Sequence, residues 1–168
     1  MSGFFARGAE AKLYESTLAG MDILVKDRSP KAYRVKELDE KLREARTRKE
    51  ARILLKAAAI GVKVPQILSA GRFSLHIEKL HGKRLREARM HKAEEKKIFR
   101  GAGKVLAMMH GAGITHGDFT PANIMLCKDG IYIIDFGLAE FSDETEEMAV
   151  DILLMEKSIP KEKFSWFL

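Results

Sequence analysis

One short segment of the sequence carries the residue types that phosphoryl transfer needs. Asp118 is followed five positions later by Asn123, and Asp135 stands at the end of the next apolar stretch. A carboxylate can accept the proton of an attacking hydroxyl, and the side-chain oxygens of Asn and Asp suit a hard cation such as Mg²⁺. The spacing therefore predicts a phosphotransferase site in which Asp118 is the catalytic base and Asn123 and Asp135 are the metal ligands.

The stretch between the last two residues has the pattern of a β-hairpin. Two runs rich in strand-forming residues, 123–127 and 131–134, flank Lys128-Asp129-Gly130. An Asp-Gly pair favours a tight turn, so the runs are expected to pair antiparallel. Pairing would bring Asn123 beside Asp135.

Each of these short patterns also has a purely structural interpretation. Asp-Gly hairpins are common, and a His-Gly-Asp or Asp-Phe-Gly triplet alone is a weak signal. Their occurrence together, in this order and on a predicted loop and strand pair, favours a kinase-type site. His116 is the exception, because we expect it to brace the loop and the Asp135-Phe136-Gly137 turn without taking part in the chemistry.

A cation for the nucleotide's phosphates is expected in the N-terminal third. The apolar run 22–26 ends in Lys26, as in a buried strand that delivers an ammonium group; a lysine that merely ends a strand is the alternative. The charged stretch 37–55 lacks Gly and Pro and predicts a helix whose apolar residues, Leu38, Leu42, Ala45 and Ile53, recur at helical spacing. Glu50 lies on the partly apolar face of this helix. A carboxylate there needs a partner, and Lys26 is suitable. Glu44 is the rival, but its arginine neighbours favour solvated helix pairs.

A loop near the N-terminus is the candidate for covering the phosphates. It consists of Gly8, Ala9, Glu10 and Ala11 and precedes a strand-like run at 12–18. The loop holds a single glycine, where protein kinases usually have a glycine-rich repeat. Backbone amides of small residues can still cradle phosphates, and we assign these four residues to ATP binding.

The next segments predict a hinge and the fold class. Strand patterns at 66–70 and 74–77 lead to residues 78–82, where backbone groups around Glu78 and Leu80 are expected to hold adenine. The order of elements predicts an α+β, bilobal, protein-kinase-like fold within one domain. Its expected parts are an antiparallel sheet lobe with a long helix (1–78), a hinge (79–82) and a reduced helical lobe (83–168).

Two helices are expected in the second lobe. The first carries an apolar stripe that we interpret as core, formed by Ile98, Ala102, Val105, Leu106 and Met109, and it ends at Gly111. The second runs from about Glu144 to Lys157 and places Met148, Ile152 and Met155 on one face, with Asp151 beside them.

Segments outside the catalytic motif resemble the atypical serine/threonine kinases of the KEOPS complex, a RIO-like family that includes the p53-related protein kinase. They are Asp27 to Arg34, Leu38-Asp39, Arg46-Thr47, Glu50-Ala51, Gly61-Val62, Pro65 and the loop at 8–11. The similarity extends from Phe4 to about Ile159. It implies an ATP- and Mg²⁺-dependent kinase or ATPase that supports formation of threonylcarbamoyladenosine in tRNA. It also implies binding to the threonylcarbamoyl-transferase subunit and a further small KEOPS subunit, and a brace from Asp151 to the catalytic loop.

The region after the last motif departs from ordinary protein kinases. From Asp135-Phe136-Gly137 the chain runs through Ser142 into the helix near Asp143, without an activation segment or an Ala-Pro-Glu-like anchor. Protein kinases use that segment to hold a peptide substrate. Ordinary peptide docking is therefore not expected, and the family that this chain resembles shares the absence.

The composition is that of a compact protein with one core. The 168 residues are 46% hydrophobic, enough for one domain divided between two lobes. No apolar run approaches the ~20 residues of a membrane span, and the first residues do not resemble a secretory signal. A cytoplasmic location without membrane contact is therefore expected. Cys127 is the single cysteine, so an intrachain disulfide is excluded.

The net charge of +6 is unevenly distributed. A basic stretch contains Lys83, Arg84, Arg86, Arg89, Lys92, Lys96, Lys97, Arg100 and Lys104, and an acidic one contains Glu140, Asp143, Glu144, Glu146 and Glu147. The basic stretch is a candidate for contact with tRNA phosphates or with an acidic partner. A solvated helix face is the alternative, because glutamates are interspersed in it.

Three functions remain in competition at the level of sequence. The preferred one is the KEOPS-type kinase or ATPase. A small-molecule kinase of the aminoglycoside or choline type shares the His-Gly-Asp pattern, but it usually adds a sizeable helical substrate domain. The third is a nucleotide-binding regulatory subunit with slow turnover.

Overall fold

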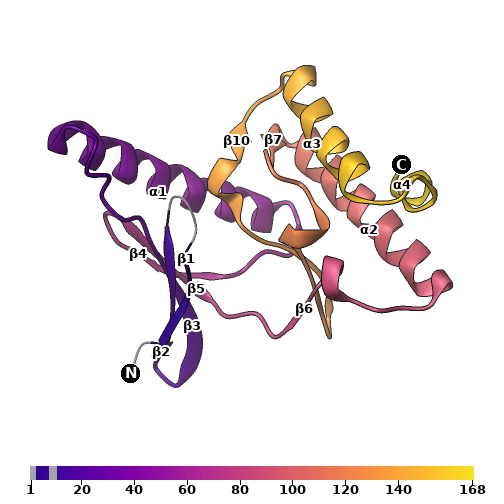
Figure 1. Ribbon diagram of the computed structural model, residues 1–168, viewed down its shortest axis with the longest axis horizontal. Helices are drawn as coiled ribbons and strands as arrows, with labels where there is room; N and C mark the ends of the chain where they lie inside the picture. Colours follow the sequence, from indigo (N-terminus) through magenta and orange to yellow (C-terminus); the bar gives the residue numbers. More distant parts are fainter. Residues whose placement is uncertain (1–2, 8–10) are drawn as a thin grey trace. The chain divides into compact units, whose positions relative to one another are not determined.

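The computed structural model of the chain describes residues 3–7 and 11–168 and confirms the predicted α+β, kinase-like fold (Figure 1). Contacts divide the chain into two compact units. The first comprises Met1–Leu55 and Pro65–Leu80, and the second comprises Lys56–Val64 and His81–Leu168. The long helix contributes to both units.

The first unit is built on a five-stranded antiparallel sheet of order β1-β2-β3-β5-β4. Its elements are β1 (Gly3–Arg7), β2 (Lys12–Leu18), β3 (Met21–Asp27), α1 (Lys36–Ala59), β4 (Ile67–Ala70) and β5 (Ser74–Glu78). The central strand β3 pairs with β2 and β5, so Lys26 lies opposite Leu13 on one side and Leu75 on the other. Lys26 therefore lies on a strand that is paired on both sides.

The buried face of α1 differs from the one that its apolar residues indicated. Leu38 is 52% exposed and Ala45 is also exposed. The buried residues between positions 36 and 50 of α1 are polar: Asp39, Thr47 and Glu50. The buried apolar residues Ile53, Leu54 and Ala57 follow toward the C-terminal end of the helix. The spacing of apolar residues predicted the wrong buried face for residues 36–50 of α1. The buried polar groups there have specific hydrogen-bond partners in the protein and do not need contact with water.

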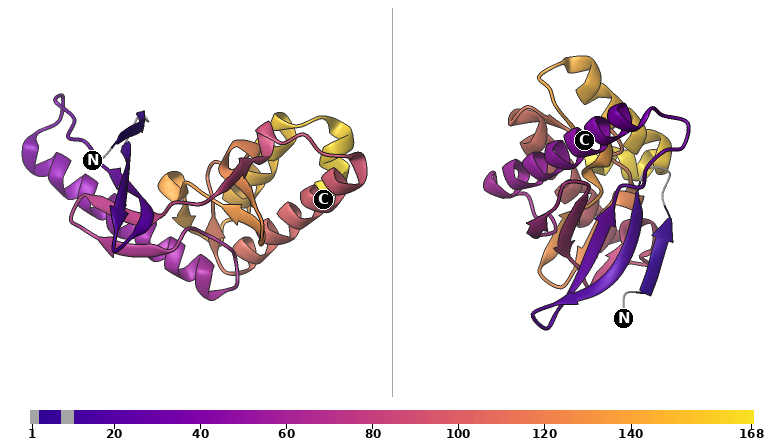
Figure 2. Two further views of the ribbon diagram at one scale, coloured as in Figure 1. Left: turned by 90° about the horizontal axis from the view of Figure 1, so that it is seen from below. Right: turned by 90° about the vertical axis from the view of Figure 1, so that its left-hand side faces the viewer.

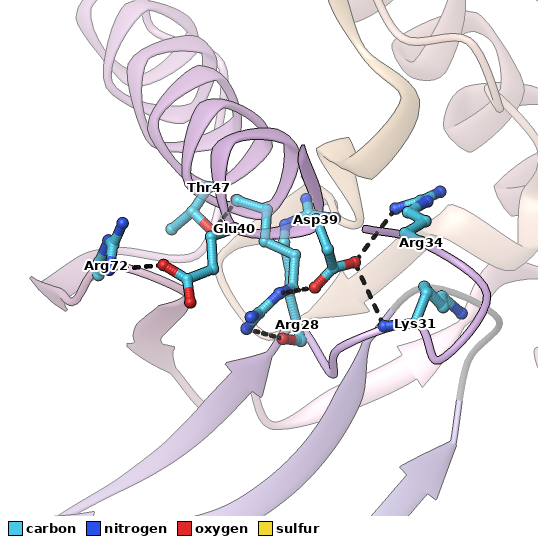
Figure 3. Close-up of polar contacts among 8 residues, drawn as sticks. Arg28, Lys31, Arg34, Asp39, Glu40, Thr47 and Arg72 are labelled. Atoms are coloured by element: carbon cyan, nitrogen blue, oxygen red, sulfur yellow. Dashed lines mark hydrogen bonds and ion pairs between the residues drawn. The ribbon is translucent and has the colours of Figure 1, made fainter. Parts of the chain in front are cut away.

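Asp39 shows how such a partner set works (Figure 3). Its carboxylate accepts hydrogen bonds from Arg43 Nε at 2.7 Å and from the backbone N–H of Lys31 at 3.2 Å, and lies 3.6 Å from Arg34. Burial disfavours its charged form, but these contacts outweigh burial and lower the pKa of the Asp39 carboxyl. Asp39 thereby joins the start of α1 to the loop that follows β3.

The second unit contains a three-stranded sheet, a two-stranded sheet and helices. The sheets have the orders β6-β8-β9 and β10-β7. The strands are β6 (Gly82–Arg84), β7 (Ile114–Thr115), β8 (Ile124–Cys127), β9 (Gly130–Ile133) and β10 (Glu140–Phe141). The α-helices are α2 (Lys92–Gly111), α3 (Thr145–Ser158) and α4 (Lys161–Phe167), and the 3-10 turns are η1 (Leu85–Glu87), η2 (Pro121–Asn123) and η3 (Phe136–Leu138). Gly82, which was expected in the hinge, begins β6.

The predicted hairpin is confirmed. Strands β8 and β9 pair antiparallel, with Ile124 opposite Ile133 and Cys127 opposite Gly130. Gly130 has a φ of 144°, a value that a residue with a side chain rarely adopts. At the open end of the hairpin the backbone N–H of Ile134 donates to the carbonyl of Asn123 at 2.9 Å.

The C-terminal helix α4 packs against α2 (Figures 1 and 2). The predicted stripe of α2 is buried at Ala102, Leu106 and Met109, together with Phe99, while Ile98 and Val105 are half-buried. The sequence interpretation did not include α4. Its Phe167 is 5% exposed, and the ring lies 6.1 Å from that of Phe119, the residue after Asp118. The end of the chain thus supports the loop that carries the candidate base.

That loop is also fixed from α3 by a buried carboxylate. Asp151 is fully buried, and it accepts hydrogen bonds from the backbone N–H groups of His116 at 2.7 Å and Gly117 at 2.8 Å. His110, near the end of α2, lies 3.0 Å from the same carboxylate through its Nε2. The brace expected from Asp151 is confirmed, and His110 is a participant that the sequence analysis did not identify.

Packing between α2 and α4 predicts opposite effects for two glycine substitutions in one helix. A Cβ atom on Gly103 would clash with the carbonyl oxygen of Phe167, whereas no atom lies within 4 Å of a Cβ on Gly111. We expect Gly103→Ala to lower the free energy of unfolding by about 1–3 kcal/mol. Gly111→Ala, the control, should leave it unchanged or raise it by up to ~1 kcal/mol. Urea unfolding measures both, and equal stabilities would contradict the close packing of α4.

The Asp151 contacts predict a loss of stability on neutralisation. An asparagine keeps one acceptor oxygen, so Asp151→Asn leaves one loop amide facing an NH₂ group. The free energy of unfolding should fall by about 1–3 kcal/mol, the cost of an unsatisfied buried donor. Glu147→Gln on the exposed side of the same helix should change it by less than ~0.5 kcal/mol. Two equal values in urea unfolding would show that Asp151 does not hold the loop.

Candidate active site

Asp118 is hydrogen-bonded to Asn123, which the sequence analysis assigned as a metal ligand of the same site. The amide Nδ2 of Asn123 donates to Asp118 Oδ2 at 2.7 Å and to the Asp118 carbonyl at 2.9 Å. The 3-10 turn Pro121–Asn123 folds the chain back so that these two residues meet. Asp118 is half-buried, and its other oxygen, Oδ1, is the one suited to accept a proton.

The donor set for a cation is made of hard oxygens. Because Nδ2 of Asn123 is directed at Asp118, the side-chain Oδ1 is the atom that Asn123 can offer to a metal. Asp135 follows Ile134, whose N–H is bonded to the Asn123 carbonyl, so both residues lie at the open end of the hairpin. An exposed carboxylate and an amide oxygen fit Mg²⁺, which keeps waters and phosphate oxygens in its remaining positions.

Asp135 has a left-handed backbone, with φ 62° and ψ 68°. This conformation is costly for a residue with a side chain, although Asp tolerates it better than most. It turns the chain from β9 into the 3-10 turn Phe136–Leu138. The strain at this position is maintained by the surrounding packing, as is common at functional sites.

His116 braces the two loops, as predicted. It is fully buried, its Nε2 lies 3.1 Å from the Ile134 carbonyl, and its Nδ1 accepts the backbone N–H of Asp118 at 3.2 Å. Its ring centroid lies 4.9 Å from that of Phe136. Burial lowers the pKa of His116, so the ring is neutral and donates through Nε2. The neutral His116 ring therefore connects the backbone N–H of Asp118 to the carbonyl of Ile134, the residue before Asp135.

The first unit contains the predicted ion pair. Lys26 Nζ lies 2.6 Å from Glu50 Oε1, and Glu50 is 4% exposed. The other oxygen, Oε2, lies 2.6 Å from Arg28, a buried residue that the sequence analysis did not assign to the site. Its position two residues after Lys26, on the same face of an extended chain, was the signal available in the sequence.

Glu44 has the solvated role that was expected of it. It pairs with Arg48 at 2.6 Å and with Arg72 at 2.9 Å. The hydrogen bond from Arg72 is the largest cause of a lowered pKa of the Glu44 carboxyl. The structure thus assigns Lys26 to Glu50 and excludes the rival partner.

The remaining nucleotide candidates are placed only in part. Gly8, Ala9 and Glu10 lie outside the described residues, whereas Ala11 is buried immediately before β2. Glu78 ends β5, where its backbone N–H donates to the Gln66 carbonyl at 2.9 Å. Leu80 is half-buried at the end of the first unit. Their contacts with ATP remain predictions.

Within residues 3–7 and 11–168, no helix is long and apolar enough to cross a membrane. In the same residues, no group of three or more His, Cys, Asp or Glu side chains is arranged to hold a metal ion. The candidate Mg²⁺ site has one carboxylate and one amide and is of a different kind.

Comparisons with known proteins agree on one family. The RIO domain matches residues 11–157. The KEOPS complex subunit Bud32 of Pyrococcus abyssi is 38% identical, over 96% of this chain and 78% of its own length. The probable serine/threonine-protein kinase BUD32 homolog of Archaeoglobus fulgidus is 36% identical, over 99% and 80%. A probable bifunctional tRNA threonylcarbamoyladenosine biosynthesis protein of Methanothermobacter thermautotrophicus is 38% identical, and this chain spans 28% of its length.

A solved structure has the same fold. The Rio2 kinase of Chaetomium thermophilum, crystallised as an ADP/Mg²⁺-phosphoaspartate complex, superposes with a TM-score of 0.79 over 93% of this chain and 54% of its own. At 15% identity this likeness concerns the fold alone. Together with the domain match and the near-complete alignment to Bud32, it leads to one conclusion. This chain belongs to the RIO-domain family, together with Bud32 and its homologues.

Proposed function

We propose that this protein is an ATP- and Mg²⁺-dependent phosphotransferase of the KEOPS complex that acts as an atypical serine/threonine kinase or as an ATPase. The observation that carries the proposal is the Asn123–Asp118 contact at 2.7 Å beside the hairpin that ends in Asp135. It supplies a fixed carboxylate next to two hard-oxygen donors. The RIO-domain match over residues 11–157 supports the same activity.

In this proposal Asp118 is the base. Its Oδ1 accepts the proton of the attacking hydroxyl or water, while the hydrogen bond from Asn123 keeps Oδ2 in place. Asp151 and His116 hold the loop backbone, so the carboxylate keeps its direction without reorganising during the reaction. Positioning of this kind is the main protein contribution to phosphoryl transfer.

The proposed metal ligands are Asn123 and Asp135. When bound, Mg²⁺ would neutralise charge on the phosphate oxygens. Asn123 would then have two roles, since Nδ2 orients the base and Oδ1 faces the cation. Asp135 would offer its carboxylate from a left-handed backbone at the end of the hairpin.

The first unit is proposed to bind the rest of the nucleotide. Lys26, oriented by Glu50, would bind the α- and β-phosphates, and residues 8–11 would cover them with backbone amides. Backbone groups near Glu78 and Leu80 would bind adenine. This division corresponds to an N-lobe at 1–78, a hinge at 79–82 and a C-lobe at 83–168.

The proposed biological role follows the names of the relatives. The names support a KEOPS subunit that takes part in threonylcarbamoyladenosine formation in tRNA. From the family resemblance we further propose that the protein acts in the cytoplasm and binds the threonylcarbamoyl-transferase subunit and a further small subunit. The exposed lysines and arginines of the basic stretch 83–104 are candidates for tRNA contact. The RIO-domain match favours this role over a small-molecule kinase.

Removal of the base should separate chemistry from binding. Asp118→Asn keeps the shape of the side chain, so ATP affinity should be unchanged while turnover falls by about 10²- to 10⁴-fold.

Asp135→Ala should instead abolish Mg²⁺-dependent turnover, because it removes the only carboxylate assigned to the metal. Steady-state ATP hydrolysis and calorimetric ATP binding provide the measurements.

Asp143→Asn is the matched control, an exposed carboxylate of the same unit outside the proposed site, and it should behave as the wild type. Normal turnover in Asp118→Asn would remove Asp118 from the chemistry. Equal losses of turnover and ATP affinity would make it a structural residue.

The exposed glutamates at the start of α3 predict a partner surface. Glu144, Glu146 and Glu147 are exposed near the loop held by Asp151. Reversing their charges to lysine should weaken association with the threonylcarbamoyl-transferase subunit, mainly at low salt, and leave ATP binding unchanged. The matched control reverses Glu37, Glu87 and Glu94, which are also exposed and give the same change of net charge. Equal association of both triple variants across a salt series would place the interface elsewhere.

A further inference from the structure

Glu50 is shared between two cations from one strand end. Its Oε1 lies 2.6 Å from Lys26 Nζ and its Oε2 lies 2.6 Å from Arg28. The side chains of Arg28 and Glu50 are 4% and 5% accessible, whereas that of Lys26 is 12% accessible. The arginine contact is therefore the more deeply buried of the two.

Arg28 is itself fixed by its backbone. Its N–H donates to the carbonyl of Phe73 at 2.9 Å, and its own carbonyl accepts Arg43 at 3.2 Å. Arg43 in turn is hydrogen-bonded to Asp39 and stacks over the Phe73 ring at 3.9 Å. The guanidinium is thus presented to Glu50 from a position that is tied to both α1 and the sheet.

We propose that Arg28 is a positioning residue that keeps Glu50 directed at β3 whether or not Lys26 remains bound to it. The proposal rests on the proposed function, in which Lys26 binds the phosphates of a nucleoside di- or triphosphate. An ammonium group has three N–H donors. With Arg28 occupying Oε2, Glu50 engages Lys26 through Oε1, and other donors of Lys26 can turn to phosphate.

The charge balance points to the same role. A buried carboxylate that loses its cation is costly. If Lys26 were the sole cation at Glu50, its movement to phosphate would expose the protein to that cost. The Arg28 contact with Oε2 forms without a nucleotide, and a planar guanidinium suits a buried ion pair. Glu50 therefore remains paired with Arg28 when Lys26 shares its donors with phosphate.

The test compares Arg28→Gln with Lys26→Met, Arg28→Lys and the control Arg48→Gln. Arg48 pairs with Glu44 at 2.6 Å, the same length as the Arg28–Glu50 pair, and is exposed on helix α1, which also carries Glu50. Without nucleotide, hydrogen exchange of amides 46–54 should accelerate in Arg28→Gln and stay near wild type in Lys26→Met and Arg48→Gln.

Calorimetry then measures the binding of Mg·ATP and of adenosine, which lacks phosphates. Arg28→Gln should weaken Mg·ATP about tenfold, the scale of one hydrogen bond to a charged group, and leave adenosine unchanged. In the Lys26→Met background the same substitution should add no further loss. Arg28→Lys should weaken Mg·ATP by a smaller factor, about threefold, because lysine lacks the planar fork.

The possible failures are distinguishable. Unchanged exchange in Arg28→Gln, or equal losses of adenosine and Mg·ATP, would overturn the positioning role. If hydrogen exchange accelerated in Arg28→Gln but Lys26→Met kept wild-type Mg·ATP affinity, the proposed role of Lys26 would be refuted. The positioning of Glu50 by Arg28 would still stand. Should the glutamine variant not fold, wild-type Mg·ATP affinity in Arg28→Lys would overturn the proposal.

Discussion

The buried carboxylate of Asp151 fixes the backbone on which the candidate catalytic residues depend. Hydrogen bonds to an ionised acceptor are worth roughly 1.5–3 kcal/mol each, more than those between neutral groups. Asp151 receives two from consecutive loop amides and a further contact from His110. His116, whose amide is one of the two, bonds onward to the Ile134 carbonyl and the Asp118 amide. One buried charge therefore orients the base and the strand before the proposed metal ligand.

In the first unit, too, buried carboxylates fix neighbouring elements through specific partners. Asp39 and Glu50 are both buried in α1, and each is held by arginines and by groups outside the helix. Among the residues that the structure describes, no buried side-chain nitrogen or oxygen lacks a hydrogen-bond partner. Full satisfaction matters because a half-satisfied polar network costs more than an apolar core. It makes the position of α1 depend on specific polar pairs as well as on the apolar contacts of Ile53, Leu54 and Ala57.

The sequence predicted those features that have a local cause. The Asp-Gly turn between two runs of strand-forming residues predicted the β8–β9 hairpin. The Asn123–Asp118 contact was not predicted, because it depends on the 3-10 turn at Pro121–Asn123. The Lys26–Glu50 pair was found because Glu50 had to be buried beside Ile53 and Leu54. Arg28 was missed because Lys26 alone was assigned to Glu50, and His110 was missed because its partner Asp151 lies 41 residues further along the chain. The first half of α1 was misjudged because Asp39 and Thr47, not Leu38, face inward.

Helix α4 shows a second limit of sequence reasoning. Seven residues are too few to form a stable helix alone, so local propensity gives little signal. Its stability comes from packing: Phe167 against Phe119 and the close approach to Gly103 require the folded partner surfaces. Phe119 also lies edge-on to His116, with ring centroids 5.7 Å apart. The aromatic contacts from α4 and the polar contacts from α3 thus converge on the same few loop residues, and together they fix the backbone of the loop that carries Asp118.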